Sequence, residues 1–376
     1  MTGFSLKQLH GRVSKGGHVL KRWWRAIWEP TRPEFRINNF DLLRIFAATQ
    51  VLIFHTANRF QVPVPGWADP LKLFPGVPIF YVISGYLVSA SYERQTSVLT
   101  YFKNRFLRIY PGLWVNLGFT VVVLLCFGYR FTHLSNYGWL LAQFLGFFYT
   151  PDFLKTFGFG HYNGSLWTII VELQFYFLLP VLYRTMRGAK SGNRILLTFL
   201  FAFMAARLVL NYSHPHMGGA GESPMERLVQ YTFVPHFFMF LLGVTLQRYR
   251  VYTSSIVAGK GPLWVALYVL SKLLLPDVPL VWVFSDALLA VSIVSAAYTL
   301  PRTAERVLRG QDISYGVYIY HGLLINIVIQ MKLAPNSSNQ LILLVATSAC
   351  LLGTLSWFFV ERPFLRKKRK LEGLPG

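Results

Sequence analysis

Ionisable side chains within long apolar segments are the first candidates for chemistry in this sequence of 376 residues. Such groups are costly in apolar surroundings, and those that are kept commonly have a function. His55 follows Arg44 by eleven residues in one apolar segment, so a helix would place both on one face, about 16.5 Å apart. Glu172 follows Ser165 by seven residues and shares a helical face with it. The pattern brings an imidazole, a carboxylate and a guanidinium group into apolar surroundings.

Proton transfer is the chemistry that His55 and Glu172 could perform together. Counted from the ends of their apolar segments, both lie at a similar depth, roughly 7.5 Å for His55 and roughly 10 Å for Glu172. An imidazole can remove a proton near neutral pH, and a carboxylate can orient it for that task. The alternatives are an ion pair that only joins two helices and, for Arg44, an arginine whose head reaches the polar surface.

Arg105 and Arg108 lie three residues apart in the basic stretch 103–111, so they project from one side of a helical turn. Two guanidinium groups in that arrangement can bind phosphate oxygens with paired hydrogen bonds. The pattern is typical of a site for a phosphate-rich ligand, although the same charges would also serve as a topology signal alone.

The composition predicts that these residues belong to an integral membrane protein. Of the residues, 53% are hydrophobic and 14% charged, whereas a soluble domain has about 25% charged residues. Ten spans of roughly 20 residues would leave no room for a large soluble catalytic domain. The net charge of +22 falls between apolar runs, which argues against nucleic-acid binding. His214 and His216 lack a third ligand nearby, and both cysteines lie in apolar runs, so we expect no metal site.

Helices that cross the membrane must position the candidate residues. We expect an all-α integral membrane protein with about ten transmembrane helices. Residues 137–150 should form one partial or re-entrant segment, because only about 14 apolar residues lie there. The predicted spans are residues 40–60, 74–92, 111–129, 165–184, 194–212, 228–247, 262–276, 281–300, 313–332 and 340–360.

The distribution of basic residues predicts the topology. With ten spans, 28 Lys and Arg residues lie on or at the border of the side that holds both termini, and about six lie on the other side. The positive-inside rule then places both termini in the cytoplasm. Residues 1–39 should form a basic cytoplasmic segment with a possible helix on the membrane surface, and residues 365–376 a basic tail that contacts lipids.

Six motifs between residues 40 and 364 occur in an order that resembles acyltransferase family 3 of bacterial membrane proteins. That family includes O-acetyltransferases of exopolysaccharide and of the O-antigen of lipopolysaccharide. The chain departs from the family pattern at Leu173, where a second acidic residue is usual, and at Tyr81, which follows Phe80 in place of a Phe pair. The motifs are Asp41 to Arg44 with His55, Phe80 to Leu87, Arg105 to Pro111, Ser165 to Tyr176, Ile313 to His321, and Val360 to Phe364.

The resemblance implies a membrane enzyme, an acyl-CoA-dependent O-acyltransferase of the bacterial inner membrane. Cytoplasmic acyl-CoA, expected to be acetyl-CoA, would donate its acyl group to a hydroxyl of a cell-surface or lipid-linked saccharide. Acyl-CoA is here a co-substrate, and no tightly bound cofactor is expected. We expect direct transfer rather than an acyl-Ser84 intermediate, since no base is placed beside that serine.

The resemblance also implies roles for individual residues. His55 is expected to be the general base, with Glu172 as the second catalytic group. The donor site is expected to hold the phosphates of CoA, with the pantetheine arm running along the bundle. Its residues would be Arg44, Arg105, Arg108, Tyr110 and His321, and further substrate contacts would come from Ser84, Ser165, Trp167 and Tyr315.

Three other functions stay open from the sequence. The acyl group could be succinyl or another group, and the acceptor could be a small molecule such as a macrolide. A transporter or flippase of polysaccharide intermediates would also have many spans and buried charges. It would be expected to show internal repeats and paired broken helices, and we see neither in the sequence.

Overall fold

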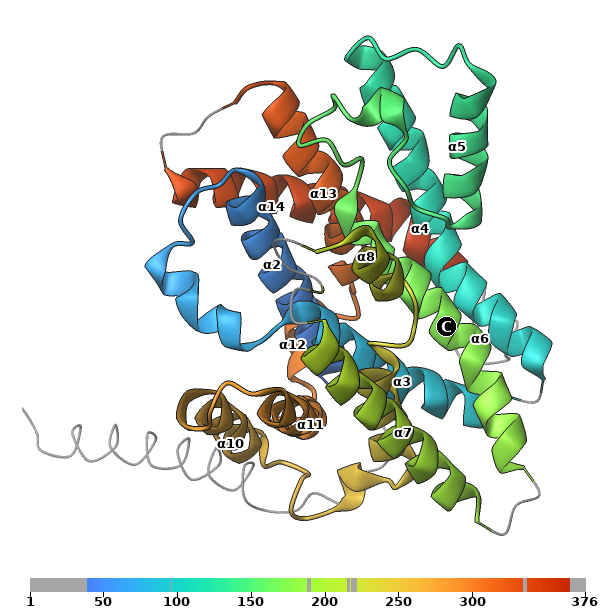
Figure 1. The fold of residues 1–376 in the computed structure, drawn as a ribbon, viewed down its shortest axis with the longest axis vertical. Coiled ribbons are helices and arrows are strands. Elements are labelled where there is room, and N and C mark those ends of the chain that lie inside the picture. Colours follow the sequence, from blue (N-terminus) through green and yellow to red (C-terminus); the bar gives the residue numbers. More distant parts are fainter. Residues whose placement is uncertain are drawn as a thin grey trace, which may run out of the picture.

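The computed structural model describes residues 39–95, 97–187, 191–214, 217, 222–333 and 337–365. Every regular element within these residues is helical, which confirms the all-α part of the predicted fold class (Figure 1). The predicted surface helix within residues 1–39 and the basic tail after residue 365 lie almost entirely outside the described residues.

Each predicted apolar segment contains a helix. The long helices are α2 (Phe40–Arg59), α3 (Gly76–Glu93), α4 (Val98–Cys126), α6 (Trp167–Met186), α7 (Gly192–Ser213), α11 (Pro279–Ala297), α13 (Ser314–Gln330) and α14 (Ser338–Ser356). Shorter helices are α5 (Leu134–Leu145), α8 (Pro224–Gln230), α9 (Phe237–Arg248), α10 (Gly261–Leu274) and α12 (Thr303–Leu308). A π-helical turn, Trp357–Glu361, continues α14.

The predicted number of about ten spans is not confirmed. Six described helices are long and apolar enough to cross a membrane, or seven if the 3₁₀ helix Gly66–Leu73 and α3, bent by 43°, count as one span. Helices α9 and α10 have 12 and 14 residues. At 1.5 Å per residue they reach only about 18 and 21 Å, whereas the hydrocarbon core of a bilayer measures about 30 Å.

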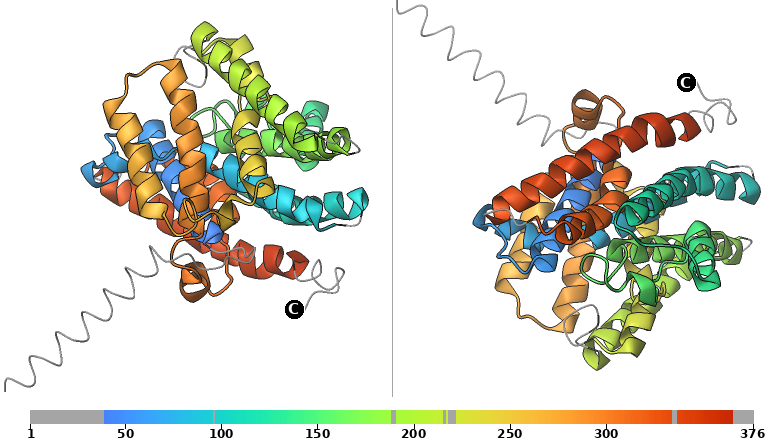
Figure 2. Two further views of the ribbon diagram at one scale, coloured as in Figure 1. Left: turned by 90° about the horizontal axis from the view of Figure 1, so that it is seen from below. Right: turned by 90° about the horizontal axis from the view of Figure 1, so that it is seen from above.

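Helix α3 crosses the middle of the molecule and packs against α2, α6, α9 and α11 (Figure 1). Two glycines permit its close contact with α9. An added Cβ at Gly85 would lie 2.0 Å from the carbonyl oxygen of Phe240, and one at Gly243 would lie 2.2 Å from that of Val82. Small residues of this kind let helix backbones approach closely. Outside this centre, α10 and α11 form an antiparallel pair (Figure 2).

Helix α5 has the length and course of a partial segment. It runs beside α4 and stops near the middle of that helix, where the Trp114 indole donates to the carbonyl of Phe144 at 3.0 Å. Gly146, with φ of +93°, ends α5 in the left-handed conformation. The chain then turns back, and Phe159 donates its N–H to Asn326 on α13. The stretch therefore enters and leaves at the same end of α4 (Figure 1).

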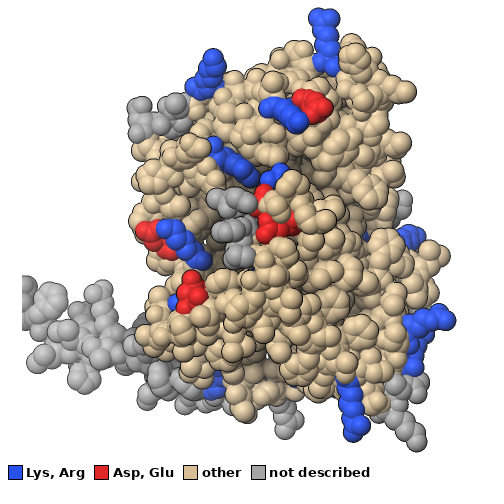
Figure 3. Space-filling model, in the orientation of Figure 1, with Lys and Arg blue, Asp and Glu red and all other residues tan. Residues whose placement is uncertain are grey.

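The surface of the molecule is largely apolar. Figure 3 shows a face on which uncharged residues cover most of the area and Lys and Arg are scattered. Large apolar side chains on several helices are highly exposed, among them Leu99 at 80%, Phe359 at 76% and Leu134 at 87%. Exposed apolar area of this extent indicates contact with lipid.

Candidate active site

A cavity of about 440 Å³ follows one face of α3. Its lining residues on α3 recur every three or four positions from Val77 to Arg94, a length of about 25 Å along the helix axis. We call the end near Arg94 the arginine end and the end near Tyr81 the tyrosine end. The facing wall includes Arg44, Arg105, Arg108, Thr168, Glu172, Tyr176, Asp312, Tyr315, Tyr318 and Trp357.

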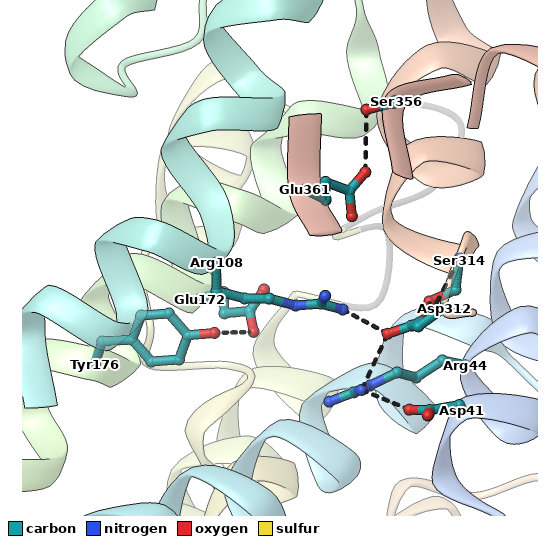
Figure 4. Close-up of polar contacts among 9 residues, drawn as sticks. All are labelled: Asp41, Arg44, Arg108, Glu172, Tyr176, Asp312, Ser314, Ser356 and Glu361. Carbon is teal, nitrogen blue, oxygen red and sulfur yellow. Dashed lines mark hydrogen bonds and ion pairs between the residues drawn. The ribbon is translucent and has the colours of Figure 1, made fainter. Parts of the chain in front are cut away.

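Asp312, just before α13, holds two of the predicted arginines at the arginine end (Figure 4). One carboxylate oxygen accepts from Arg108 at 2.6 Å and from Arg44 at 3.3 Å. Arg44 also donates to Asp41 at 3.1 Å. The other oxygen of Asp312 accepts from the N–H of Ser314 at 3.2 Å. This carboxylate therefore fixes two guanidinium groups at the cavity wall.

Electrostatics keep Asp312 ionised. Burial alone would raise the pKa of its carboxyl, but Arg108, Arg44 and the Ser314 hydroxyl lower it below the ordinary value. Arg105 lies on the other side of this end, where it donates to Ser91 at 3.4 Å and stacks over the Tyr176 ring at 5.6 Å. Four arginines line this end of the cavity against the carboxylates of Asp41 and Asp312, so the arginine end carries a net positive charge.

Glu172 on α6 lies midway along the cavity and accepts two hydrogen bonds. Ser84 of α3 donates to it at 2.9 Å. Tyr176 donates to the same oxygen at 2.5 Å, as Figure 4 shows. The predicted contact with His55 is not among the hydrogen bonds of the described residues. The structure instead joins Glu172 to the predicted substrate residue Ser84, so the expectation that no base lies beside this serine is wrong.

His55 on α2 pairs with His321 on α13, because these two helices pack together. The distance between His55 Nδ1 and His321 Nε2 is 3.0 Å, and His321 Nδ1 lies 2.6 Å from the carbonyl oxygen of Tyr318. Since a carbonyl only accepts, the proton of His321 is on Nδ1 and its Nε2 is an acceptor. His55 must then donate from Nδ1, which leaves its Nε2 with a free lone pair.

The histidine pair lies directly behind the wall of the cavity. Neither ring is among the lining residues, but Tyr318 is, and its ring centroid lies 5.5 Å from that of His321. The Tyr318 hydroxyl lies 2.6 Å from the Thr168 hydroxyl on α6. His321, expected at the donor site, is instead the partner of His55, fully buried behind Tyr318.

Three other predicted residues lie outside the cavity lining. Tyr110 stacks on Phe106 and donates to the Leu145 carbonyl at 3.0 Å. Ser165 donates to Asn163 at 2.7 Å, and Trp167 stacks on Tyr231 at 6.0 Å. Tyr315 does line the cavity, where its hydroxyl donates to the Ile109 carbonyl at 2.8 Å.

Sequence reasoning missed several polar groups of the site. Asp312 directly precedes the motif that begins at Ile313, which was the only signal for it. Tyr81 and Trp357 line the cavity with a buried hydroxyl and a buried indole N–H that have no hydrogen-bond partner among the described residues. Ser356 donates to one carboxylate oxygen of Glu361 at 3.0 Å, and the other oxygen is buried with no partner in the part of the chain that the structure describes (Figure 4).

Apolar helices around an elongated polar cavity, with cations at one end and titratable groups further along, define a helical membrane protein with a site suited to group transfer. The model of the acyltransferase domain of family 3 matches residues 37–361, so the chain belongs to acyltransferase family 3. The family resemblance of the motifs is thereby confirmed. The match to the family model also supports the assignment of the chain as a multi-pass membrane acyltransferase.

Several curated proteins are similar over most of their length. "Nodulation protein 10" of Rhizobium leguminosarum bv. viciae is 32% identical over 359 residues, which cover 89% of this chain and 95% of that protein. "O-acetyl transferase" of Shigella phage Sf6 is 25% identical over 88% of this chain and 96% of its own. "Putative acetyltransferase ORF330" of Acidianus two-tailed virus is 23% identical over 75% and 81%. No solved structure matches the chain significantly.

Proposed function

We propose that the protein is an O-acyltransferase that moves an acyl group, with acetyl as the expected group, from cytoplasmic acyl-CoA to a hydroxyl of a cell-surface or lipid-linked saccharide. The observation that carries the proposal is the elongated cavity, which joins an arginine cluster to Glu172 and Ser84 and ends beside the histidine pair. Two relatives are named as acetyltransferases, which supports acetyl as the group transferred.

The dimensions of the cavity support acyl-CoA as the donor. Ser84 lies ten residues before Arg94 on the cavity face of α3, about 15 Å away along the helix. That length suits an extended pantetheine arm between phosphates at the arginine end and a thioester at mid-cavity. Arg105 and Arg108 would bind phosphate oxygens, with Arg44 beside them. Glu172 lies beside Ser84 at mid-cavity and remains the second catalytic candidate after His55.

His55 would act as the general base through its free Nε2. The hydroxyl oxygen of the acceptor attacks the thioester carbonyl while His55 takes the proton, and the carbon–sulfur bond then breaks. The departing thiolate takes the proton back from the imidazolium. His321 and the carbonyl of Tyr318 would orient His55 and stabilise its charged form, as the third group of a triad does.

The charge distribution supports an orientation in the bacterial inner membrane. The arginine end of the cavity would face the cytoplasm with both termini, and the tyrosine end would face the acceptor saccharide. This arrangement matches a cytoplasmic donor with an acceptor on the outer face.

The purified protein in lipid nanodiscs tests the proposal. With acetyl-CoA and membranes that contain the acceptor glycan, we expect free thiol to appear and the glycan to gain the mass of one acetyl group. Succinyl-CoA in a parallel sample distinguishes the acyl groups by mass. Transport of glycan across vesicle membranes without release of thiol from either donor would contradict the proposal and support a flippase.

A further inference from the structure

Three buried donors in the cavity wall lack a hydrogen-bond partner within the described residues. They are the hydroxyl of Tyr81, the indole N–H of Trp357 and the Nε–H of Arg105. A buried donor without a partner costs free energy, so a group of this kind beside a cavity calls for a ligand that supplies the acceptor. Of these three donors, the Tyr81 hydroxyl lies farthest from the arginine end.

The ring of Tyr81 is fixed by its neighbours while its hydroxyl is unused. The side chain is 3% exposed and packs edge-on against Phe175, with ring centroids 5.1 Å apart. It also packs at a tilt against His236, with ring centroids 5.4 Å apart. A phenylalanine would make the same ring contacts. The hydroxyl is therefore an addition that packing does not require.

The position of Tyr81 matches the place of a thioester. Tyr81 precedes Ser84 by three residues, so both project from the same side of α3 into the cavity. Ser91, which contacts Arg105, lies ten residues beyond Tyr81, about 15 Å along the helix. Ser84 already donates its hydrogen to Glu172. At this depth the Tyr81 hydroxyl is thus the donor that is free to meet a carbonyl oxygen.

We propose that Tyr81 is a further catalytic residue, whose hydroxyl donates a hydrogen bond to the carbonyl oxygen of the acyl thioester. This inference rests on the proposed function. As the acceptor oxygen bonds to the carbonyl carbon, that oxygen becomes negative and the hydrogen bond strengthens. The proton of the acceptor passes to His55 and then to the departing thiolate, while Tyr81 keeps its own proton throughout. A preorganised neutral donor serves this role without a change of charge.

Tyr81→Phe removes the hydroxyl and keeps the ring. We expect kcat to fall by roughly 10²-fold, since the loss of one oxyanion donor has effects of about this size, while KM for acyl-CoA changes little. Thermal stability without ligand should be unchanged or higher, because an unpaired buried hydroxyl is removed. The matched control is Tyr268→Phe, which removes a buried hydroxyl that donates to the Leu73 carbonyl outside the cavity. That variant should lose stability and keep kcat.

Isotope-edited infrared spectroscopy separates a hydrogen bond to substrate from a structural effect. The acyl carbonyl of carbon-13-labelled acetyl-CoA, bound without acceptor, should absorb at a lower frequency in the wild-type protein than in Tyr81→Phe. Equal frequencies in both proteins, or an undiminished kcat in the variant, would overturn the role of Tyr81. Failure of the wild-type protein to bind labelled acetyl-CoA would instead overturn the proposed donor.

Discussion

At the scale of single residues, two hydrogen bonds decide which nitrogen of His55 can accept a proton. The carbonyl of Tyr318 fixes the tautomer of His321, and His321 fixes that of His55. The orienting group of the proposed base is therefore a second imidazole anchored on the backbone. A carboxylate at that place would hold the charged imidazolium more strongly, so this arrangement favours a neutral base in the resting site.

The histidine pair should behave as one unit in kinetics. His55→Ala is expected to lower turnover by at least 10²–10⁴-fold, the contribution of a positioned proton transfer, and to leave acyl-CoA binding by calorimetry nearly unchanged. His321→Ala should also lower turnover, and the double variant should be little worse than His55→Ala.

Glu172→Gln is the comparison variant for the double-mutant cycle of His55 and His321. Glu172 has no hydrogen bond to either histidine among the described contacts, so its effect should multiply with that of His321→Ala. Multiplying losses for His55 and His321 would show that the two imidazoles act separately. A His55→Ala variant with an unchanged kcat and a much weaker affinity for acyl-CoA would mean that His55 belongs to the donor site.

The carboxylate of Asp312 should make stability depend on pH. Its pKa in the folded protein is lowered below about 3.9, the unfolded value, so its ionised form stabilises the fold above that pH and the effect is lost on further acidification. Asp312→Asn should cost ~3 kcal/mol at pH 7, because two guanidinium groups lose a buried partner. The difference in thermal stability from wild type should shrink between about pH 5 and pH 3.

A surface pair is the control for Asp312. Asp152 forms an ion pair with Lys155 at 2.6 Å, but its side chain is 91% exposed. Asp152→Asn should leave thermal stability nearly unchanged, because solvent screens an exposed ion pair. A stability difference for Asp312→Asn that is small at pH 7, or constant down to pH 3, would mean that Asp312 does not hold the arginines in solution.

At the scale of elements, the contact between α3 and α9 positions the cavity wall. Gly243→Ala would place a methyl group 2.2 Å from a backbone oxygen of α3, which the backbones can relieve only by moving apart. We expect a loss of ~3 kcal/mol or more and lower activity, measured by thermal unfolding and turnover. Gly118→Ala on α4 is the matched control, since nothing lies within 4 Å of the added Cβ. It should be neutral or slightly stabilising.

The course of α5 predicts where the loops around it lie. Single cysteines at positions 133 and 155, in a protein without Cys126 and Cys350, should both react with an impermeant thiol reagent added outside the cell. His133 precedes α5 and Lys155 follows its return, and the Lys155 side chain is 65% exposed. Labelling of position 155 from the cytoplasmic side alone would mean that residues 134–150 cross the membrane.

The lengths of the apolar segments and the turn residues between them predicted the helices well, because both are local signals in the sequence. These signals did not reveal that a helix can begin late within a predicted span. Residues 231–236 form turns, so α9 begins only at Phe237. The side-chain partners were harder to predict. Depth counted along a single helix cannot tell that α13 packs beside α2, so His55 was paired with Glu172 rather than with His321. Asp312 lay outside every apolar segment and was overlooked for that reason.

At the scale of the whole molecule, a site that joins a donor on one side of a membrane to an acceptor on the other must not become a passage. Tyr318 separates the elongated cavity from the histidine pair, and its hydroxyl is tied to Thr168 and to the Ser165 carbonyl across the gap between α13 and α6. While no substrate is bound, the same side chain therefore closes the route along the cavity, and it would have to move aside for His55 to reach the acceptor hydroxyl.

The consequence concerns the permeability barrier of the cell. With Tyr318 in place, proteoliposomes should hold an imposed pH gradient as long as protein-free vesicles do. Tyr318→Ala should let the gradient decay several-fold faster, because water would then connect the cavity to the histidines and protons could pass along it. Equal decay with both proteins would place the seal elsewhere. In a membrane that stores energy as a proton gradient, loss of this one tyrosine ring would let an acyl-transfer enzyme dissipate that gradient.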